Sequence, residues 1–414
     1  MNDLLSNSIR YCSPGRIHFG VGIRHELPRL LHHIGYRSAV LVTDRFFWKP
    51  GGVAMEMAAS LEEQGIRCTV YDGCEPDPSL DLCDRATWAL KAQADVDCVI
   101  ALGGGSNIDL AKVLTLTLRH NAPAASFVGT KTLPCEPLPL IAVPTTSGTA
   151  SEITPGAILV AGDGQTKVAV MDNKLRAQVA VIDPELTVSC PPRVTADAGI
   201  DALAHALESF ITLPSGQYDL EGHPDPGYSG ANVLTRIFAL ESIRLCFRFL
   251  ERAYKTPTDM EARGGMALAS LYAGLSYGNA GLNGVHALAY GVAAATHETH
   301  GTTNAVMLPY VMADLADSCT EDLSEVARIA GVWTSHESSR DAALRAATFV
   351  RGLIGAVELP TSLSALGVAE SEIETIASAG VRVQRLTKAY PANDPENRYS
   401  QIVRAAFEGR LPER

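Results

Sequence analysis

Three kinds of segment are missing from this 414-residue sequence, and each absence excludes a class of function. No apolar run approaches the roughly 20 residues that a membrane helix needs, and the first residues lack a basic segment followed by an apolar core. No block of consecutive Lys or Arg offsets the formal net charge of −12, so phosphate backbones and anionic lipids are not attracted. We therefore expect neither a membrane nor a nucleic acid as a partner.

The nine cysteines also lack a CxxC pair of the kind that binds zinc or performs redox chemistry. Scattered thiols fit a reducing compartment, so we expect a cytoplasmic protein. What is present is a globular composition, with 46% hydrophobic and 19% charged residues. A chain of this length exceeds the size at which one hydrophobic core keeps growing, which predicts two domains.

The first half of the chain has the pattern of an α/β domain. From about residue 10 to residue 185, short β-branched apolar runs such as SAVLVTD, CTVYDG and VDCVIALGGGS alternate with amphipathic stretches. The runs VLVT and CVIAL are apolar on both faces, as a parallel sheet covered by helices on both sides requires. The sequence predicts a Rossmann-like parallel sheet in a dinucleotide-binding domain over residues 1–186.

The second half is expected to be helical. After Leu186 the chain consists of long Ala- and Leu-rich stretches such as GIDALAHALESFIT, which predicts an all-α domain over residues 187–414. The boundary is placed in segment 183–192, which three prolines interrupt. Segment 212–230 is rich in Pro, Gly and polar residues and is predicted to be a long loop, either a functional lid or subunit contact or a plain surface excursion.

Two turns in the first half are candidates for phosphate binding. Gly103, Gly104, Gly105 and Ser106 follow the strand CVIAL, and PTTSGTASE, residues 144–152, follows the apolar run LPLIAV. Glycines at a strand-to-helix turn let backbone amides approach a pyrophosphate, although a tight turn alone also explains them. Because the carboxyl ends of parallel strands meet at one edge of the sheet, we expect the two turns to lie at the edge where nucleotides bind.

Asp44 ends the strand SAVLVT at the corresponding edge. A carboxylate there accepts hydrogen bonds from a ribose diol and repels a 2′-phosphate, which favours NAD over NADP. The alternative is an aspartate that caps a turn or a helix.

Asp201 and His205 lie four positions apart in a helix-compatible stretch, so both side chains project from one face. This is the geometry of two ligands on one metal, and also that of an ordinary i,i+4 ion pair. His286 and His300 flank a largely apolar segment, where each ring requires a metal or a hydrogen-bond partner in the core. Three imidazoles with one carboxylate suit Fe²⁺ or Zn²⁺ and not calcium or magnesium. His297 is interpreted as a surface or supporting residue.

Several motifs, in order along nearly the whole chain, carry a family resemblance. GGGSNIDLAK, PTTSGTASEIT, TADAGIDALAHALESFIT, NGVHALAYG and THETHGTTNAVMLPYV resemble the iron-containing (group III) alcohol dehydrogenases. The resemblance implies a dehydroquinate synthase-like architecture with the active site between the domains, and hydride transfer between an alcohol and NAD. It also implies a homodimer or larger assembly.

Carried over residue by residue, the resemblance implies specific site residues. The implied metal ligands are Asp201, His205, His286 and His300. The implied cofactor-binding residues are Asp44 near the adenosine ribose, Gly103, Gly104, Gly105, Ser106, Asn107, Asp109, Thr145, Thr146, Ser147, Thr149, and Lys167.

The chain departs from the family pattern at two places. Tyr290 stands where many members have a histidine proposed to pass protons to solvent, and a phenol relays a proton without titrating near neutrality unaided. The other departure is the insert around GHPDPGYSGANVL. Both resemble the hydroxyacid-oxoacid transhydrogenase branch, which implies short hydroxy acids such as 4-hydroxybutyrate as substrates.

The sequence leaves alternative functions open. One is a transhydrogenase with NAD as a bound hydride carrier, and another is a reductase of a different small functionalised aldehyde, such as a phosphono- or sulfo-aldehyde. A metal-free or zinc polyol dehydrogenase would differ in its ligands, and a catalytically silent binding protein would have lost a ligand or a glycine turn. Neither loss is seen in the sequence.

Overall fold

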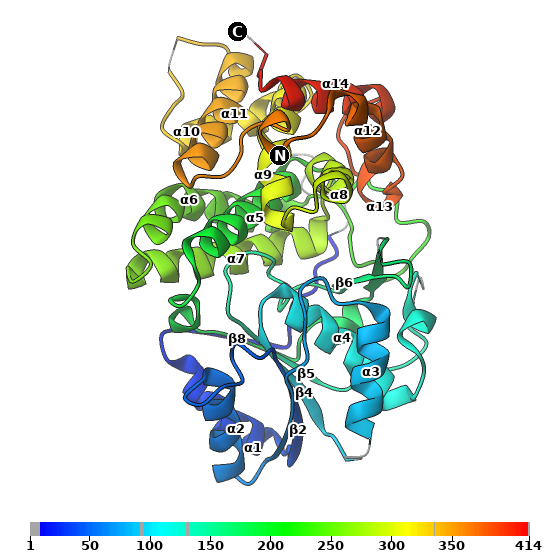
Figure 1. Ribbon diagram of the computed structural model, residues 1–414. Helices are drawn as coiled ribbons and strands as arrows, with labels where there is room; N and C mark the ends of the chain where they lie inside the picture. The colour runs from blue at the N-terminus through cyan, green and yellow to red at the C-terminus, as the bar shows by residue number, and fades with distance from the viewer. Residues whose placement is uncertain (1–8, 92–94, 130–131, 165, 335, 413–414) are drawn as a thin grey trace. The chain divides into compact units, whose positions relative to one another are not determined.

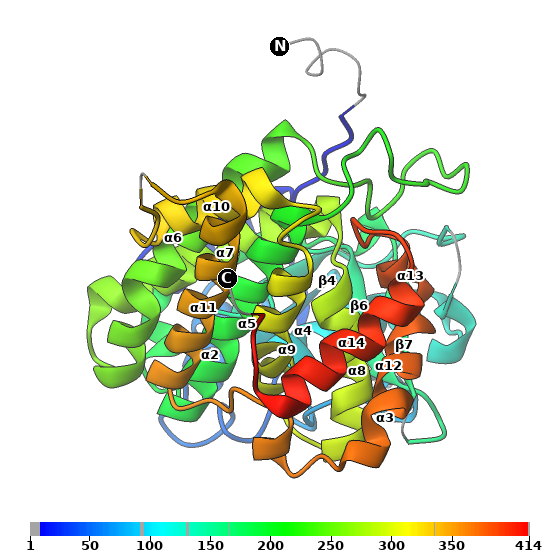
Figure 2. The ribbon, with the colours of Figure 1, turned by 90° about the horizontal axis from the view of Figure 1, so that it is seen from above.

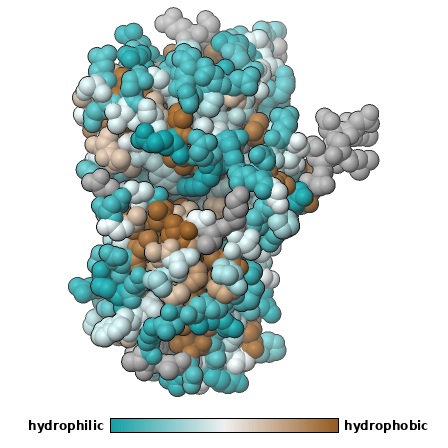
Figure 3. All heavy atoms as spheres, turned by 90° about the vertical axis from the view of Figure 1, so that its right-hand side faces the viewer, coloured by the Kyte–Doolittle hydropathy of each residue, from teal (hydrophilic) through white to brown (hydrophobic). Residues whose placement is uncertain are grey.

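The computed structural model describes residues 9–91, 95–129, 132–164, 166–334 and 336–412. Within these ranges no helix is long and apolar enough to cross a membrane. Figure 3 shows a face on which hydrophilic side chains predominate and apolar ones gather in a limited area.

The chain divides into two compact units between Ser189 and Cys190 (Figure 1). The α/β unit consists of residues 12–189 together with a short excursion, residues 225–227. The helical unit contains the rest of the described chain, including the residues that precede Cys12.

A six-stranded parallel sheet forms the centre of the α/β unit, with the strand order β1-β8-β5-β4-β2-β3. Its strands are β1 (Arg16–Phe19), β2 (Ser38–Val42), β3 (Arg67–Tyr71), β4 (Cys98–Gly103), β5 (Leu140–Pro144) and β8 (Val179–Ile182). The strand order reverses between β2 and β4. In open α/β sheets such a switch point opens a crevice beyond the carboxyl ends of the strands, and ligands bind there.

Helices cover both faces of this sheet, as the apolar strands require (Figure 1). The helices are α1 (Leu27–Ile34), α2 (Val53–Glu63), α3 (Leu80–Lys91) and α4 (Gly105–His120). Leu41 and Ile100 join the core made with α1 and α2, whereas their neighbours Val40 and Val99 join the core made with α3 and α4. The structure thus confirms the predicted Rossmann-like sheet.

An antiparallel pair of strands, which the sequence pattern did not indicate, completes the α/β unit. β6 (Gly156–Val160) pairs with β7 (Lys167–Met171). Short 3-10 helices η2 (Ile23–Glu26), η3 (Ala124–Phe127), η4 (Asn173–Leu175) and η5 (Pro184–Thr187) connect the other elements.

The second unit is helical, as predicted (Figure 2). Its α-helices are α5 (Pro192–Ile211), α6 (Val233–Lys255), α7 (Met260–Ala280), α8 (Gly284–Thr296), α9 (His300–Asp314), α10 (Thr320–Ile329), α11 (Ser339–Ala356), α12 (Ile373–Val381), α13 (Gln384–Thr387) and α14 (Pro395–Glu408), with 3-10 helices η6 (Ser364–Leu366) and η7 (Glu370–Glu372). Pro192 occupies the first turn of α5, where its fixed φ favours helix initiation. Between α5 and α6 the chain is a long loop, in which Pro214 and Ala231 form an isolated parallel β-bridge.

Candidate metal centre and cofactor-binding turns

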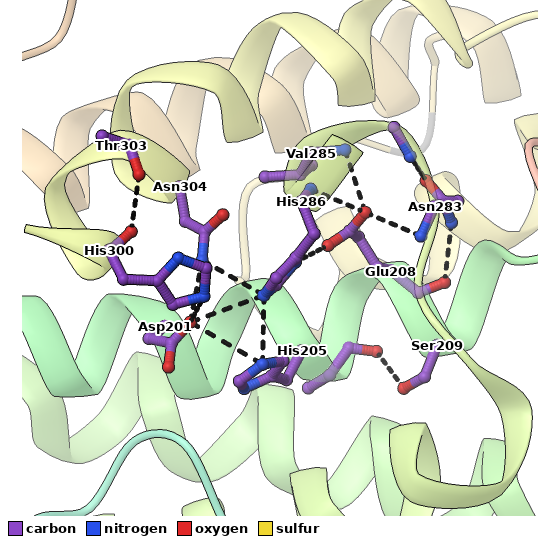
Figure 4. A network of polar contacts seen from close by, with 12 residues as sticks. Asp201, His205, Glu208, Ser209, Asn283, Val285, His286, His300, Thr303 and Asn304 are labelled. Carbon is purple, nitrogen blue, oxygen red and sulfur yellow. Dashed lines mark hydrogen bonds and ion pairs between the residues drawn. The ribbon is translucent and has the colours of Figure 1, made fainter. Parts of the chain in front are cut away.

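Asp201 and His205 lie on one face of α5, as their spacing predicts (Figure 4). Both side chains are buried, with 3% and 5% of their surface exposed. The helix is long and rich in alanine. A buried carboxylate and a buried imidazole each require a hydrogen-bond partner, an opposite charge or a metal.

The other two predicted ligands come from two later helices, α8 and α9. His286 lies in the first turn of α8, and His300 is the first residue of α9. A Cβ at Gly301 would lie 2.3 Å from the backbone oxygen of Asp197, so only glycine allows α9 to approach α5 this closely. That approach brings His300 beside Asp201.

Ligand atoms of Asp201, His205 and His286 lie within 4.8 Å of one another, and His300 lies no farther than this from Asp201, on its other side (Figure 4). Oδ1 of Asp201 lies 3.7 Å from Nε2 of His205, 3.6 Å from Nε2 of His286 and 3.7 Å from Nε2 of His300. The Nε2 atoms of His205 and His286 are 3.1 Å apart. Ligand atoms of a tetrahedral metal site with bonds of about 2.1 Å are about 3.4 Å apart, so the spacing fits a single transition-metal ion.

Asn304, one turn after His300, aims its amide nitrogen at the same ligand atoms. Its Nδ2 donates to Oδ1 of Asp201 at 2.8 Å and lies 3.1 Å from Nε2 of His286 and 3.2 Å from Nε2 of His300. The lone pairs of Asp201, His286 and His300 that face this N–H group could equally face a cation. The donor set therefore fits a divalent metal.

The carboxylates and imidazoles of this cluster shift one another's pKa values. Burial raises the pKa of Asp201, but His205, His300 and His286 outweigh burial and hold it well below its usual range. Burial lowers the pKa of His286, but Glu208 and Asp201 outweigh burial and raise it to about 10. The cluster keeps a carboxylate ionised in a site from which water is largely excluded, as a cation ligand requires.

Glu208, which was not predicted from the sequence, contacts the ring nitrogen of His286 that points away from the other ligands. It lies on α5 and is fully buried, and its Oε2 contacts Nδ1 of His286. Its Oε1 accepts backbone N–H groups from Asn283 at 3.0 Å and Val285 at 2.9 Å. A carboxylate on Nδ1 fixes the tautomer of the ring and leaves Nε2 to face the metal position.

The signal for Glu208 and Asn304 was present in the sequence. Glu208 follows His205 by three positions and Asn304 follows His300 by four, so both share a helix face with a predicted ligand. Tyr277 of α7 stacks on the ring of His205, with centroids 4.0 Å apart. No sequence spacing connects those two rings.

Tyr290, the candidate proton relay, lies one turn after His286 on α8. Its ring stacks beside that of His300, with centroids 6.3 Å apart, and Arg385 donates a hydrogen bond to its hydroxyl oxygen at 2.8 Å. Tyr290 is half-buried and lies between His300 and Arg385. His297 is exposed at the end of α8, on the surface.

In the α/β unit, the two predicted turns lie side by side. Gly103 pairs with Pro144 in the sheet register, and the backbone N–H of Thr145 donates to the oxygen of Gly103 at 3.0 Å. A Cβ at Gly105 would lie 2.7 Å from the side chain of Thr149, so only glycine fits between the turns. The N-terminus of α4 thus opens between two small-residue turns, where backbone amides can approach an anion.

Asp44 belongs to the same edge of the sheet. It follows β2, across the switch point from β4, and its Oδ2 accepts a hydrogen bond at 3.0 Å from Nδ2 of Asn107. Its Oδ1 accepts the backbone N–H of Phe46 at 2.9 Å. Asp44 therefore caps a turn and is also linked to the glycine-turn helix.

The remaining predicted cofactor residues have structural partners. Asp109 accepts hydrogen bonds from the Ser151 hydroxyl and from the backbone N–H of Ile158 at 2.9 Å, and burial raises its pKa. Lys167 pairs with Asp77 at 2.7 Å, and Ser106 accepts the backbone N–H of Asp77 at 3.3 Å. The short polar side chains of Thr146 and Ser147 are half-buried in the second turn.

Comparison with known proteins assigns the family. The model for "Iron-containing alcohol dehydrogenase" matches residues 14–184, and that for "Fe-containing alcohol dehydrogenase family, C-terminal" matches residues 227–407. The chain belongs to the iron-containing alcohol dehydrogenase family. The family resemblance of the sequence motifs is confirmed, and the chain is an oxidoreductase of the alcohol dehydrogenase type.

Among the relatives of this iron-containing alcohol dehydrogenase, long-chain-alcohol dehydrogenase 1 of Geobacillus thermodenitrificans is 35% identical over 98% of both chains. The mitochondrial hydroxyacid-oxoacid transhydrogenase of Pongo abelii is 31% identical over 94% of this chain and 88% of its own. The solved structure of an alcohol dehydrogenase from Oenococcus oeni matches with a TM-score of 0.89 and 26% identity, covering 97% of this chain and all of the other.

Proposed function

We propose that this protein is an NAD- and metal-dependent alcohol dehydrogenase that acts on a short hydroxy acid or its carbonyl form. The observation that carries the proposal is the approach of His205, His286 and His300 to one carboxylate oxygen of Asp201. The proposed metal is Fe²⁺, and Zn²⁺ suits the same donors. The proposed assembly is a homodimer or larger.

The two units have separate proposed tasks. The α/β unit, residues 1–186 in the sequence-based division, is proposed to bind NAD through Gly103–Asn107, Asp109, Thr145–Thr149, Lys167 and Asp44. Support comes from the position of both turns and Asp44 at the carboxyl ends of the neighbouring strands β4, β5 and β2, at and beside the switch point of the sheet. The helical unit is proposed to hold the metal and the substrate.

The proposed reaction removes two hydrogens from the substrate. The carbinol C–H bond breaks and its electron pair leaves with the hydrogen as a hydride, which the nicotinamide of NAD⁺ accepts. The hydroxyl proton leaves to solvent, and the products are a carbonyl compound, NADH and H⁺. A metal held by the four ligands would act as a Lewis acid on the substrate oxygen. The protein's own residues orient the substrate, exclude water and pass on the proton, and Tyr290 is the proposed first carrier.

A transhydrogenase reaction is the second candidate, in which NAD stays bound and carries the hydride from a hydroxy acid to an oxo acid. The observation that favours it is the similarity to hydroxyacid-oxoacid transhydrogenases over nearly the whole chain. Turnover with a hydroxy acid and an oxo acid in the absence of free NAD would distinguish it from a dehydrogenase.

The test is a panel of short alcohols, hydroxy acids, aldehydes and oxo acids with NAD(H), on purified protein loaded with Fe²⁺ or Zn²⁺. His286→Ala removes one ligand and should abolish both bound metal and turnover while leaving NAD binding, followed by NADH fluorescence, largely intact. His297→Ala, an exposed histidine of the same helix end, is the matched control and should retain metal and activity. Full metal content and activity in His286→Ala would refute the ligand assignment.

A further inference from the structure

Arg385 contacts a tyrosine that packs against one of the proposed metal ligands. Three of the four proposed ligand side chains are almost fully buried, whereas 32% of the His300 side chain is exposed. Tyr290 stacks on this more exposed ligand, and Arg385 of α13 donates to the Tyr290 hydroxyl oxygen at 2.8 Å. Tyr290 and Arg385 are both half-buried.

In the part of the chain that the structure describes, Arg385 forms no ion pair with a carboxylate. Its partners are phenols: the hydroxyl and ring of Tyr290, whose centroid lies 5.6 Å from Cζ of Arg385, and the nearby Tyr228 and Tyr218. Lys388, three positions further along, provides the contrast, because its ammonium pairs with Glu221 at 2.7 Å. A half-buried guanidinium among aromatic rings lacks the counter-ion that a buried charge normally has.

Several properties of Arg385 suit it to bind a carboxylate. A guanidinium presents N–H donors in a planar fork that matches the two oxygens of a carboxylate. One N–H is used on Tyr290, and this bond fixes the orientation of the side chain. Arg385 is half-buried, so a small molecule can reach it and the bond would be partly shielded from water.

We infer that Arg385 is the specificity-determining residue that binds the carboxylate of the hydroxy acid, with its hydroxyl end directed towards the ligand cluster. The inference rests on the proposed function and deepens it, because it assigns the discrimination between charged and uncharged alcohols to one side chain. Tyr290 positions Arg385 by accepting its hydrogen bond.

The test compares 4-hydroxybutyrate with 4-hydroxybutyramide, which has nearly the same shape but no charge, and with 1-butanol. Wild-type protein should prefer the acid over the amide. Arg385→Gln should lower kcat/KM for the acid by about ten- to hundredfold, mainly through KM, and change it little for the amide and for 1-butanol. Arg385→Lys keeps the charge but loses the planar fork of N–H donors. Its kcat/KM for the acid should lie between those of wild type and Arg385→Gln. Lys388→Gln is the matched control and should leave the preference unchanged.

Binding of succinate, a dicarboxylate that cannot be oxidised at a hydroxyl group, gives a readout apart from turnover. Calorimetry should detect succinate binding to wild type and its loss in Arg385→Gln. If the wild-type protein oxidises the amide and 1-butanol as well as the acid, Arg385 does not select carboxylates, although the proposed dehydrogenase function stands. If no alcohol in the panel reduces NAD, the proposed function itself fails. An unchanged acid preference in Arg385→Gln would also overturn the inference.

Discussion

The buried carboxylate of Glu208 contacts Nδ1 of His286 on the side of the ring opposite the metal position. The same carboxylate accepts backbone N–H groups at the start of α8, so the helix and the ring are fixed by one group. Glu208 is therefore placed to set which nitrogen of His286 carries the proton. A change at Glu208 should act on the metal through His286 and not by direct contact.

Glu208→Gln is expected to weaken metal binding by about ten- to hundredfold, because a neutral amide makes the ring a poorer ligand and no longer enforces one tautomer. The affinity is measured by competition with a chromogenic chelator. The matched control is Ser209→Ala on the same helix, which removes the buried hydrogen bond to Ser276. It should reduce thermal stability but keep the metal affinity. Wild-type affinity in Glu208→Gln would show that Glu208 only holds α8 in place.

At the nucleotide edge, Asp44→Gly is expected to relax the preference for NAD, because the carboxylate that would repel a 2′-phosphate is removed. The ratio of kcat/KM with NAD to that with NADP measures the effect. Asp44 also caps the turn at Phe46, which glycine cannot do. Asp44→Asn separates the two roles, since an amide oxygen still accepts that N–H but carries no charge. An unchanged ratio in both variants would show that Asp44 is a structural cap.

The fold could be predicted from the sequence where buried helices and strands leave a regular pattern of apolar residues. Strands such as β2 and β4 are buried on both faces, and their uninterrupted apolar runs reveal this. β6 and β7 were not predicted because they are short and only partly buried, so their pairing depends on contacts made elsewhere in the fold.

The site was predictable to the extent that its residues share a helix. The spacing of Asp201 and His205 places them on one face of α5, and the same periodicity would have added Glu208. The contact of Arg385 with Tyr290 could not be predicted from the sequence, because 95 positions separate the two residues and only the packing of α13 against α8 brings them together. Local periodicity carries no information about such a contact.

Tyr290→Phe tests the proposed proton relay. Loss of the hydroxyl should lower kcat by about ten- to hundredfold and flatten its pH profile, because the proton would then leave by a less direct route. The profile is measured with an uncharged alcohol, so that any effect on Arg385 does not enter. Tyr272→Phe, a tyrosine of α7 whose ring packs near Phe238, is the control. Kinetics like those of wild type in Tyr290→Phe would remove the phenol from the mechanism.

Glu152, at the end of the second turn, predicts a pH dependence of stability. It is buried, and burial raises its pKa to about 7 despite a backbone hydrogen bond and the nearby Lys112, which lower it. The folded protein therefore holds this proton at a pH where the unfolded chain, with an ordinary pKa of 4.5, has lost it. Its stabilising contribution is fully present below about pH 4.5 and is lost as the pH rises through about 7.

Glu152→Gln should remove this part of the pH dependence, because an amide stays neutral throughout. The free energy of unfolding, from urea denaturation at pH 5 and pH 8, should fall less with rising pH in the variant than in wild type, by up to about 3 kcal/mol. Glu63→Gln, which changes an exposed glutamate of α2, should behave like wild type. Equal slopes for Glu152→Gln and wild type would mean that Glu152 ionises at the same pH in the folded and unfolded chain.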